Sequence, residues 1–402
     1  MNRPKRVLLM AENLPIARDH RLRKQAAALV AAGFAVTVVC RRDPENRKIA
    51  GITLREYPAP PDAESKLGYL QEYGWSLLMA SWKILSCLLA EGFDVIQVAS
   101  TPDIYFILTL PLRALGKTVV FDARDLSPEI YARRYGRSDG LVFDVLRLLE
   151  RASYRAAHAV LVVNSSVALV ATERCGVPTE RVTLVGNGPV LSEVRPNKPE
   201  PASSDGGLLC CWIGLMGPQD GVDIALRAVA QLVHGRGRID TRFVFAGTGD
   251  ALPALEALAA ELHLGEWVSF PGWADSEQVA NILRSAHVGL EPNLEDFVSP
   301  VKAMEYMVYG LPVVAFDLRE TRRIVGSGGL YASRGDIDGF TDCIEMLLDN
   351  PQIRQRLGAV GKRRVRSTFA WEHQELRYIR LYENLLEGRR EWADASQECA
   401  PV

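Results

Sequence analysis

The chain has 402 residues, 48% of them hydrophobic and 24% charged, and a formal net charge of −2. This length predicts two domains, and the composition is that of an ordinary globular protein. The slightly negative charge disfavours a nucleic-acid-binding surface, so we expect no nucleic-acid partner. Seven scattered cysteines without a C-x-x-C pair are typical of a reduced compartment, which predicts a cytoplasmic protein.

Short apolar runs alternate with longer helical patterns in the first half of the chain. The expected strands are 6–11, 34–40, 52–57, 94–98, 118–122 and 159–163. The expected helices between them are 18–32, 75–90, 104–115 and 141–156. This alternation predicts a parallel sheet with helices on both faces. The apolar stretch 75–90 contains Lys83 and is too short to cross a bilayer, so we expect a buried helix there.

The segment 192–207 is rich in Pro, Ser and Gly and has no apolar period, which predicts a linker. After it the alternation resumes, with expected strands at 208–213, 242–246, 267–270, 287–291 and 313–316. The sequence therefore predicts an α/β protein with two doubly wound Rossmann-like domains facing a cleft, 1–191 and 208–368. We expect 369–402 to form a C-terminal helix that packs back towards the first domain, followed by a tail.

Glycines follow three expected strands of the second domain. Gly214 and Gly217 follow one, Gly247 follows the next, and Gly272 precedes Trp273 after a third. In doubly wound sheets ligands bind beyond the carboxyl ends of the strands, and glycine lets backbone N–H groups approach a phosphate. Each loop alone is typical of a tight turn. Together they favour a phosphate-bearing ligand, with the Trp273 ring available to a base.

The stretch 296–314 combines a helix start with charged side chains. Ser299 is expected as the N-cap and Pro300 as the first helical residue, while Lys302 and Glu305 share one helix face. A helix N-terminus with a hydroxyl and a lysine suits an anion, and the glutamate suits hydroxyl groups. The alternative is a capped helix with a solvated Lys–Glu pair.

Polar loops also follow strands of the first domain. Asn13 and Leu14 follow the first strand, and the loop 122–129 contains Arg124 and Asp125. One interpretation of the second loop is a cation and a base facing the cleft, and the other is a turn with internal ion pairs. The six histidines show no metal-ligand spacing, so we expect no metal and no cofactor.

These motifs make the chain resemble the GT-B glycosyltransferases of family 4, which are retaining and nucleotide-sugar-dependent. The most specific match is Ser299-Pro300-Val301-Lys302-Ala303-Met304-Glu305-Tyr306 with Gly310-Leu311-Pro312-Val313-Val314. The resemblance implies a nucleoside diphosphate sugar as donor, a ribose contact for Glu305, and a diphosphate loop over 212–223. The loop 121–129 would lie over the sugar, and Asn13 and Leu14 resemble the first loop of one subgroup. The acceptor would be a hydroxyl of a glycan, a glycolipid or a small molecule.

The chain departs from the family pattern at four positions. Phe297 stands where the family usually has a second glutamate, Leu215 and Asp220 replace a basic pair in the diphosphate loop, and Arg124 stands where histidine is common. Buried phosphate charge needs compensation, so we hypothesise that Lys302 and Arg124 provide it. The departures leave two alternatives open: a catalytically weak GT-B partner or sensor protein, and a nucleotide-sugar epimerase of the same fold.

A basic cluster at 362–366 is interpreted as a solvated helix face, with contact to an anionic membrane as the alternative. Under that alternative the protein would be peripheral at the inner face of the membrane.

Overall fold

The computed structural model describes residues 3–60, 66–194 and 207–388. The chain divides into two compact units: unit 1 comprises residues up to 186 and those from 375 onward, and unit 2 comprises 187–374. Each unit contains one parallel sheet, so the predicted α/β class with two Rossmann-like domains is confirmed. Most of the predicted linker 192–207 lies outside the described residues.

Unit 1 is built on a seven-stranded parallel sheet in the order β3-β2-β1-β4-β5-β6-β7. Its strands are β1 Arg6–Met10, β2 Ala35–Arg41, β3 Ile52–Tyr57, β4 Val95–Ala99, β5 Thr118–Ala123, β6 Ala159–Val162 and β7 Val182–Leu184. Its helices are α1 His20–Ala31, α2 Lys66–Ala90, α3 Phe106–Ala114, α4 Ser127–Tyr135, α5 Leu141–Ala156 and α6 Ser165–Leu169, with short helical turns at Pro44–Lys48, Val170–Arg174 and Thr179–Arg181.

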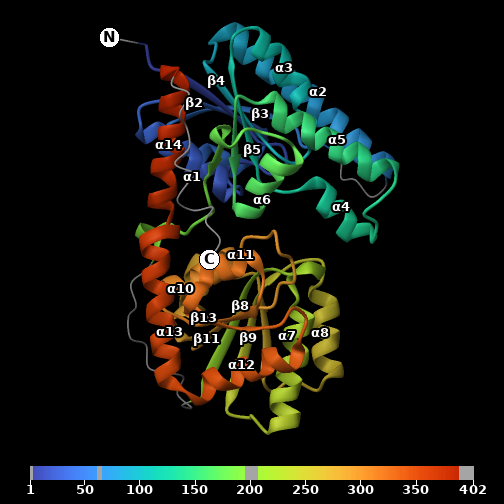
Figure 1. The fold of residues 1–402 in the computed structure, drawn as a ribbon, viewed down its shortest axis with the longest axis vertical. Helices are drawn as coiled ribbons and strands as arrows, with labels where there is room; N and C mark the ends of the chain where they lie inside the picture. The colour runs from blue at the N-terminus through green and yellow to red at the C-terminus, as the bar shows by residue number, and fades with distance from the viewer. Residues whose placement is uncertain (1–2, 61–65, 195–206, 389–402) are drawn as a thin grey trace. The chain divides into compact units, whose positions relative to one another are not determined.

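Helices cover both faces of this sheet because the chain returns after β3 to place β4 on the other side of β1. Right-handed crossovers then place α1 on one face and α2, α3 and α5 on the other, an arrangement that Figure 1 shows. The helix α14 Trp371–Glu387 packs on the α1 side through its residues from 375 onward. There the hydroxyl groups of Tyr378 and Tyr382 donate hydrogen bonds to Gln97 Oε1, at 2.9 and 2.5 Å.

The helix α2 differs from the expectation of a buried helix at 75–90. Its inner side, with Ser76, Ala80 and Ile84, is buried against the sheet, but Leu78 is 61% exposed and Trp82 is 57% exposed. The prediction of a buried helix is therefore wrong for the outer side. By length and composition alone, the segment Gln71–Ala90 would suffice to cross a membrane, a test that core helices also pass. Composition does not distinguish an apolar side that packs from one that is exposed.

Unit 2 is built on a six-stranded parallel sheet in the order β10-β9-β8-β11-β12-β13. Its strands are β8 Leu208–Leu215, β9 Thr241–Thr248, β10 Val268–Gly272, β11 Val288–Glu291, β12 Val313–Phe316 and β13 Gly329–Ala332. Its helices are α7 Val222–Ala230, α8 Leu252–Glu261, α9 Ser276–Ser285, α10 Val301–Tyr309, α11 Arg319–Val325, α12 Ile337–Asp349 and α13 Pro351–Arg364, with short helical turns at Leu191–Glu193, Pro218–Asp220, Gln231–Gly235, Gly326–Gly328 and Val365–Phe369.

Each sheet has a point where the chain order reverses. In unit 1 it lies between β1 and β4, and in unit 2 between β8 and β11. The loops after these neighbouring strands diverge to opposite faces, which leaves a crevice where doubly wound proteins bind ligands. The candidate site is therefore described from these two places, one in each unit.

Candidate functional site

The ends of β8 and β9 lie unusually close together in unit 2. Gly214 pairs with Gly247 in the sheet register, and both have strongly positive φ angles, 142° and 146°. A Cβ on Gly247 would lie 1.8 Å from the carbonyl oxygen of Gly214, so no larger residue fits there. The two predicted phosphate-loop glycines are thus brought together at the carboxyl edge of the sheet.

Lys302 and Asp220 join the loop after β8 to α10. Lys302 Nζ lies 2.7 Å from Asp220 Oδ1, and both side chains are mostly buried. The other carboxylate oxygen of Asp220 accepts a hydrogen bond from the backbone N–H of Gly217, at 3.0 Å. Lys302 Nζ also lies 4.7 Å from the centroid of the Trp212 ring. Asp220, which replaces a basic residue of the family pattern, therefore fixes both the loop and the lysine.

The helix α10 begins one residue later than predicted. Pro300 is the N-cap and Val301 the first helical residue, because the ψ angle of Pro300 is 73° and not helical. The assignment of Ser299 as N-cap and Pro300 as first residue is therefore wrong. Ser299 and Glu305 are both partly buried, and Glu305 lies close enough to Lys302 to raise its pKa.

Close packing holds α10 against the sheet. The hydroxyl of Tyr306 accepts a hydrogen bond from the backbone N–H of Ile213, at 3.1 Å. A Cβ on Gly289 would lie 2.3 Å from the Tyr306 ring, so the absence of a side chain on β11 lets the helix approach. These contacts fix α10, and with it the backbone of Lys302, against the sheet.

Two buried polar residues, one at the end of β11 and one just after it, were not singled out from the sequence. Glu291 is 2% exposed and Asn293 is 5% exposed, and Glu291 Oε2 and Asn293 Nδ2 have no hydrogen-bond partner among the described residues. Burial raises the pKa of Glu291, and the charge of Lys302 partly offsets this rise. Burial lowers the pKa of Lys302, but the carboxylates of Glu291 and Asp220 outweigh it and raise the pKa overall. The lysine is thus held protonated.

Trp273 follows β10 and is 71% exposed, a large aromatic surface at the carboxyl edge of the unit 2 sheet. Phe297 is partly buried in the loop before α10. The carboxyl ends of these strands and the segments after them therefore hold Glu291, Asn293, Lys302 and the exposed Trp273 ring.

In unit 1 the predicted first-loop residues lie at the reversal point. Asn13 Nδ2 donates a hydrogen bond to Thr101 Oγ1, at 3.2 Å, which joins the loop after β1 to the loop after β4. The neighbouring Leu14 is 46% exposed. The first loop is thus held at the reversal point of this sheet.

Arg124 belongs to a buried ion network at the end of β5. Its guanidinium bonds Asp122 at 2.8 Å and Asp19 at 2.5 Å, and Arg21 bonds the other side of Asp122 at 2.8 Å. Burial favours a raised pKa for Asp122, but the charges of Arg21 and Arg124 outweigh it and hold the pKa below its ordinary value. The charge of Arg124 is thus balanced within unit 1. The neighbouring Asp125 is exposed, and its backbone N–H bonds Ser100 Oγ at 3.2 Å.

Two family models match the chain. The model described as "Glycosyl transferase 4-like domain" matches residues 19–188, and the model described as "Glycosyl transferases group 1" matches residues 207–350. The chain belongs to the family 4-like GT-B glycosyltransferases. The first model thus covers unit 1 from the residue before α1 onward, and the second covers all six strands of the unit 2 sheet.

The relatives of this GT-B chain include a mannosyltransferase. The present chain is 30% identical over 172 residues to the MMP alpha-(1->4)-mannosyltransferase of Mycolicibacterium hassiacum, and the match covers 41% of each chain. The chain spans about half the length of the curated relatives it matches.

Solved structures share the GT-B fold. Sucrose-phosphate synthase from Thermosynechococcus elongatus has a TM-score of 0.78 and 19% identity, over 96% of this chain and 100% of that one. Anabaena HepE, solved in complex with UDP and glucose, has a TM-score of 0.73 and 15% identity, over 95% and 100%.

Asp103, near the reversal point of unit 1, gives this GT-B chain a pH-dependent stability. It is 5% exposed, Ser127 Oγ donates a hydrogen bond to its Oδ2 at 2.5 Å, and Oδ1 has no partner among the described residues. Burial raises its pKa from 3.8 to about 7, and the Ser127 bond only partly offsets this. The folded chain therefore retains a proton that the unfolded chain loses above pH 3.8.

We expect Asp103→Asn to remove part of the pH dependence of unfolding. For the natural chain, the Asp103 contribution lowers the free energy of unfolding by up to about 1.4 kcal/mol per pH unit between the unfolded and folded pKa values, because the carboxyl stays protonated in the folded chain and unfolding releases its proton. Urea unfolding of both chains from acid to neutral pH measures the difference. Parallel pH profiles for the two chains would show that Asp103 ionises freely.

Proposed function

We propose that the chain transfers a sugar from a nucleoside diphosphate sugar to an acceptor hydroxyl, with retention at the anomeric carbon. The observation that carries this proposal is the Lys302 ammonium at the reversal point of the unit 2 sheet, beside the glycine ends of β8 and β9. An ammonium has three N–H donors. Among the described residues only Asp220 accepts a hydrogen bond from it, which leaves donors for phosphate oxygens.

The proposed chemistry separates a sugar from a diphosphate. As the bond from the anomeric carbon to the phosphate oxygen breaks, negative charge grows on the β-phosphate, and Lys302 with the first N–H groups of α10 stabilises it. The acceptor oxygen bonds to the anomeric carbon, and its proton passes to the leaving phosphate. Glu305 would accept hydrogen bonds from the ribose, and the exposed ring of Trp273 would stack on the base. The complex of HepE with UDP and glucose supports this donor class.

Unit 1 would supply the acceptor side. Because the charge of Arg124 is balanced by Asp19 and Asp122, the contacts favour Arg124 as the residue that fixes the loop before Asp125. Asp125, being exposed, would orient the sugar or accept a proton. The acceptor is a hydroxyl of a glycan, a glycolipid or a small molecule. We place the reaction in the cytoplasm, which the free, buried pair Cys210 and Cys211 supports.

Thermal unfolding with a panel of nucleotide sugars and free nucleotides tests the donor site. We expect one nucleoside diphosphate and its sugars to raise the midpoint in proportion to the logarithm of their concentration, because they bind only the folded chain. Incubation of that donor with acceptors should then release nucleoside diphosphate and form a glycoside. A sugar epimerised from the donor alone would support an epimerase instead. An unchanged midpoint with every nucleotide would contradict the proposal and support a partner or sensor protein.

A further inference from the structure

Three helices on one face of the unit 1 sheet expose apolar side chains to solvent. On α2, the exposed residues recur with spacings of three and four, and they are Trp75, Leu78, Trp82, Leu85 and Leu89. On α3 they are Ile107 and Leu110, and on α5 they are Leu141, Val142, Val145 and Leu148. We call these eleven side chains the apolar face. Clusters of exposed apolar residues of this extent mark interaction surfaces.

The apolar face is not needed to pack unit 1. On α2 the opposite stripe, with Ser76, Ala80 and Ile84, already covers the sheet. Leu89 is 79% exposed and Leu141 is 80% exposed, so these side chains contribute little to the core. The other apolar members of the face likewise point away from the sheet that their helices cover. A partner outside the chain therefore explains the composition better than folding does.

Basic residues border the apolar face. Between Ser127 and Ala156, six arginines are exposed and only two acidic residues, Asp139 and Asp144, are exposed. Three of these arginines recur every four residues along α5, as Arg147, Arg151 and Arg155. We call them the arginine row. The local excess of exposed positive charge contrasts with the net charge of −2 of the whole chain.

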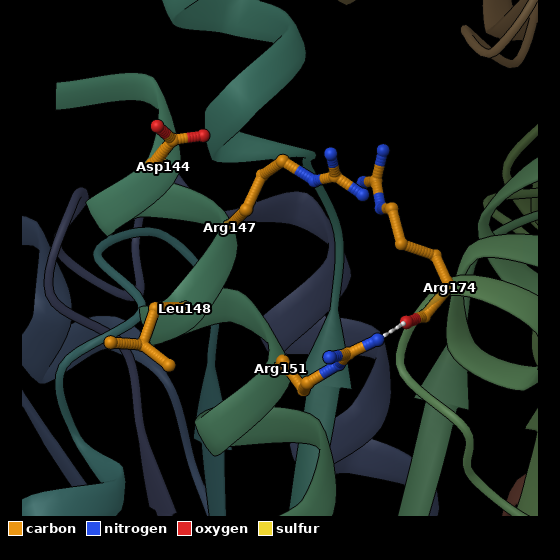
Figure 2. Close-up of a pocket in the computed structure, with 5 residues that line it drawn as sticks. All are labelled: Asp144, Arg147, Leu148, Arg151 and Arg174. Atoms are coloured by element: carbon orange, nitrogen blue, oxygen red, sulfur yellow. Dashed lines mark hydrogen bonds between the residues drawn. The ribbon is translucent and has the colours of Figure 1, made fainter. Parts of the chain in front are cut away.

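Two arginines of the row, Arg147 and Arg151, line a pocket of about 230 Å³ together with Asp144, Leu148 and Arg174. Figure 2 shows the guanidinium groups of Arg147 and Arg174 facing each other at this pocket. Arg151 Nη2 donates a hydrogen bond to the carbonyl oxygen of Arg174, at 2.8 Å. Arg174 is paired with Glu129 and Glu150, whereas no described residue pairs with Arg147. The guanidinium of Arg147 is therefore the one at this pocket that suits a phosphate group.

We propose that the apolar face and its arginine row bind the surface of an anionic lipid bilayer. Tryptophan at a helix surface with lysine and arginine at its border is the composition of membrane–water interfaces, and Lys83 Nζ lies 4.5 Å from the Trp82 ring centroid. The phosphate of a lipid headgroup pairs with Arg147, the arginine of this pocket that has no ion-pair partner among the described residues. The helix α2 lies along the membrane and does not cross it, because its inner stripe remains packed on the sheet.

A second copy of the chain fits this face less well. The heptad-like spacing of Trp75, Leu78, Trp82 and Leu85 would suit a partner helix. A symmetric dimer, however, joins the same patch on both copies, so the arginine rows at the border would repel each other. An anionic bilayer supplies both the apolar layer and the opposite charge. This inference concerns a surface apart from the proposed donor site, and either can fail without the other.

Flotation with lipid vesicles tests the proposal. The full chain should bind vesicles of phosphatidylcholine mixed with phosphatidylglycerol, bind phosphatidylcholine alone more weakly, and lose binding as salt is raised. We expect Leu85→Glu to weaken binding about tenfold or more and Arg147→Glu to weaken it about fivefold or more, because the first removes apolar insertion and the second an attraction. Both side chains are exposed, so the two variants should have the same thermal unfolding midpoint as the natural chain.

Matched substitutions on α14 provide the controls. Leu376 and Arg380 are exposed on that helix, on the opposite side of the sheet, so Leu376→Glu and Arg380→Glu should bind vesicles like the natural chain. Brominated lipids should quench the tryptophan fluorescence of the natural chain more than that of Trp82→Phe. The proposal is overturned if the natural chain ignores anionic vesicles, or if Leu85→Glu binds them unchanged. It is also overturned if sedimentation shows a dimer that Leu85→Glu separates while no vesicle binding occurs.

Discussion

Replacing Arg21 by alanine should lower the free energy of unfolding by about 3–5 kcal/mol, since it removes one partner of a buried ion pair. Arg21 Nη2 and Asp122 Oδ1 lie 2.8 Å apart and the two side chains are 6% and 0% exposed. Arg21 also donates a hydrogen bond to the carbonyl oxygen of Val185, at 2.7 Å. The substitution leaves that acceptor and one side of Asp122 unpaired in the interior. Guanidinium unfolding at neutral pH measures the loss.

An exposed ion pair of the same residue types is the control. Arg322 and Asp317 pair at 2.6 Å, but both side chains are about half exposed. Arg322→Ala should therefore cost at most about 1 kcal/mol. If Arg21→Ala were no more destabilising than Arg322→Ala, the network around Asp122 would contribute little, and Arg124 would not depend on it for its position.

The layer structure of both units follows from local sequence patterns. The strand expected at 118–122 is β5 Thr118–Ala123, and the one expected at 313–316 is β12 Val313–Phe316. Each contains a run of at least three consecutive apolar residues, which is typical of buried parallel strands, and each is bounded by a turn signal. Period and length suffice here even though buried strands of unit 1 contain polar residues such as Gln97 and Asp122, because those side chains are hydrogen-bonded inside the unit.

The candidate site was predictable only in part, because its contacts join distant segments. Gly214, Gly247 and Lys302 were expected from strand ends and a helix start. That Asp220 bonds Lys302, 82 residues away, depends on the neighbourhood of β8 and β11. The sequence predicts Glu291 only as the end of a strand, since nothing local distinguishes a buried carboxylate at a reversal point from one at any other strand end.

The prediction that α2 is buried was wrong for its outer side for a different reason. A helix that is apolar all round is normally buried, and the sequence 75–90 carries this pattern. Its inner and outer stripes are equally apolar, so only the packing of Ala80 against the sheet and the exposure of Trp82 separate them. The spacing of apolar residues predicts the helix. It does not predict which of the two stripes packs on the sheet and which is exposed.

Lys302→Ala should lower donor affinity and reduce kcat about a hundredfold or more, the size of effect seen when a charge-stabilising donor is removed from a transition state. Among the described residues that contact Asp220, Lys302 is the only cation. Lys302→Met is the better-matched variant, since it keeps an unbranched stem against Trp212 and removes only the charge. Equilibrium dialysis of the nucleotide and steady-state rates measure the two effects. Lys362→Ala, on α13, should behave like the natural chain.

Asp220→Asn separates a role in phosphate binding from a role in holding the loop. Asparagine still accepts the hydrogen bond from Gly217, so the loop keeps its shape, while Lys302 loses the carboxylate that competes with a phosphate for it. If Lys302 serves the phosphate, Lys302→Met should be far more damaging than Asp220→Asn. Equal losses in kcat from the two variants would instead assign the pair a structural role. In that case the leaving group would depend on the backbone N–H groups of α10, because the pair would hold the loop in place without contributing its charge.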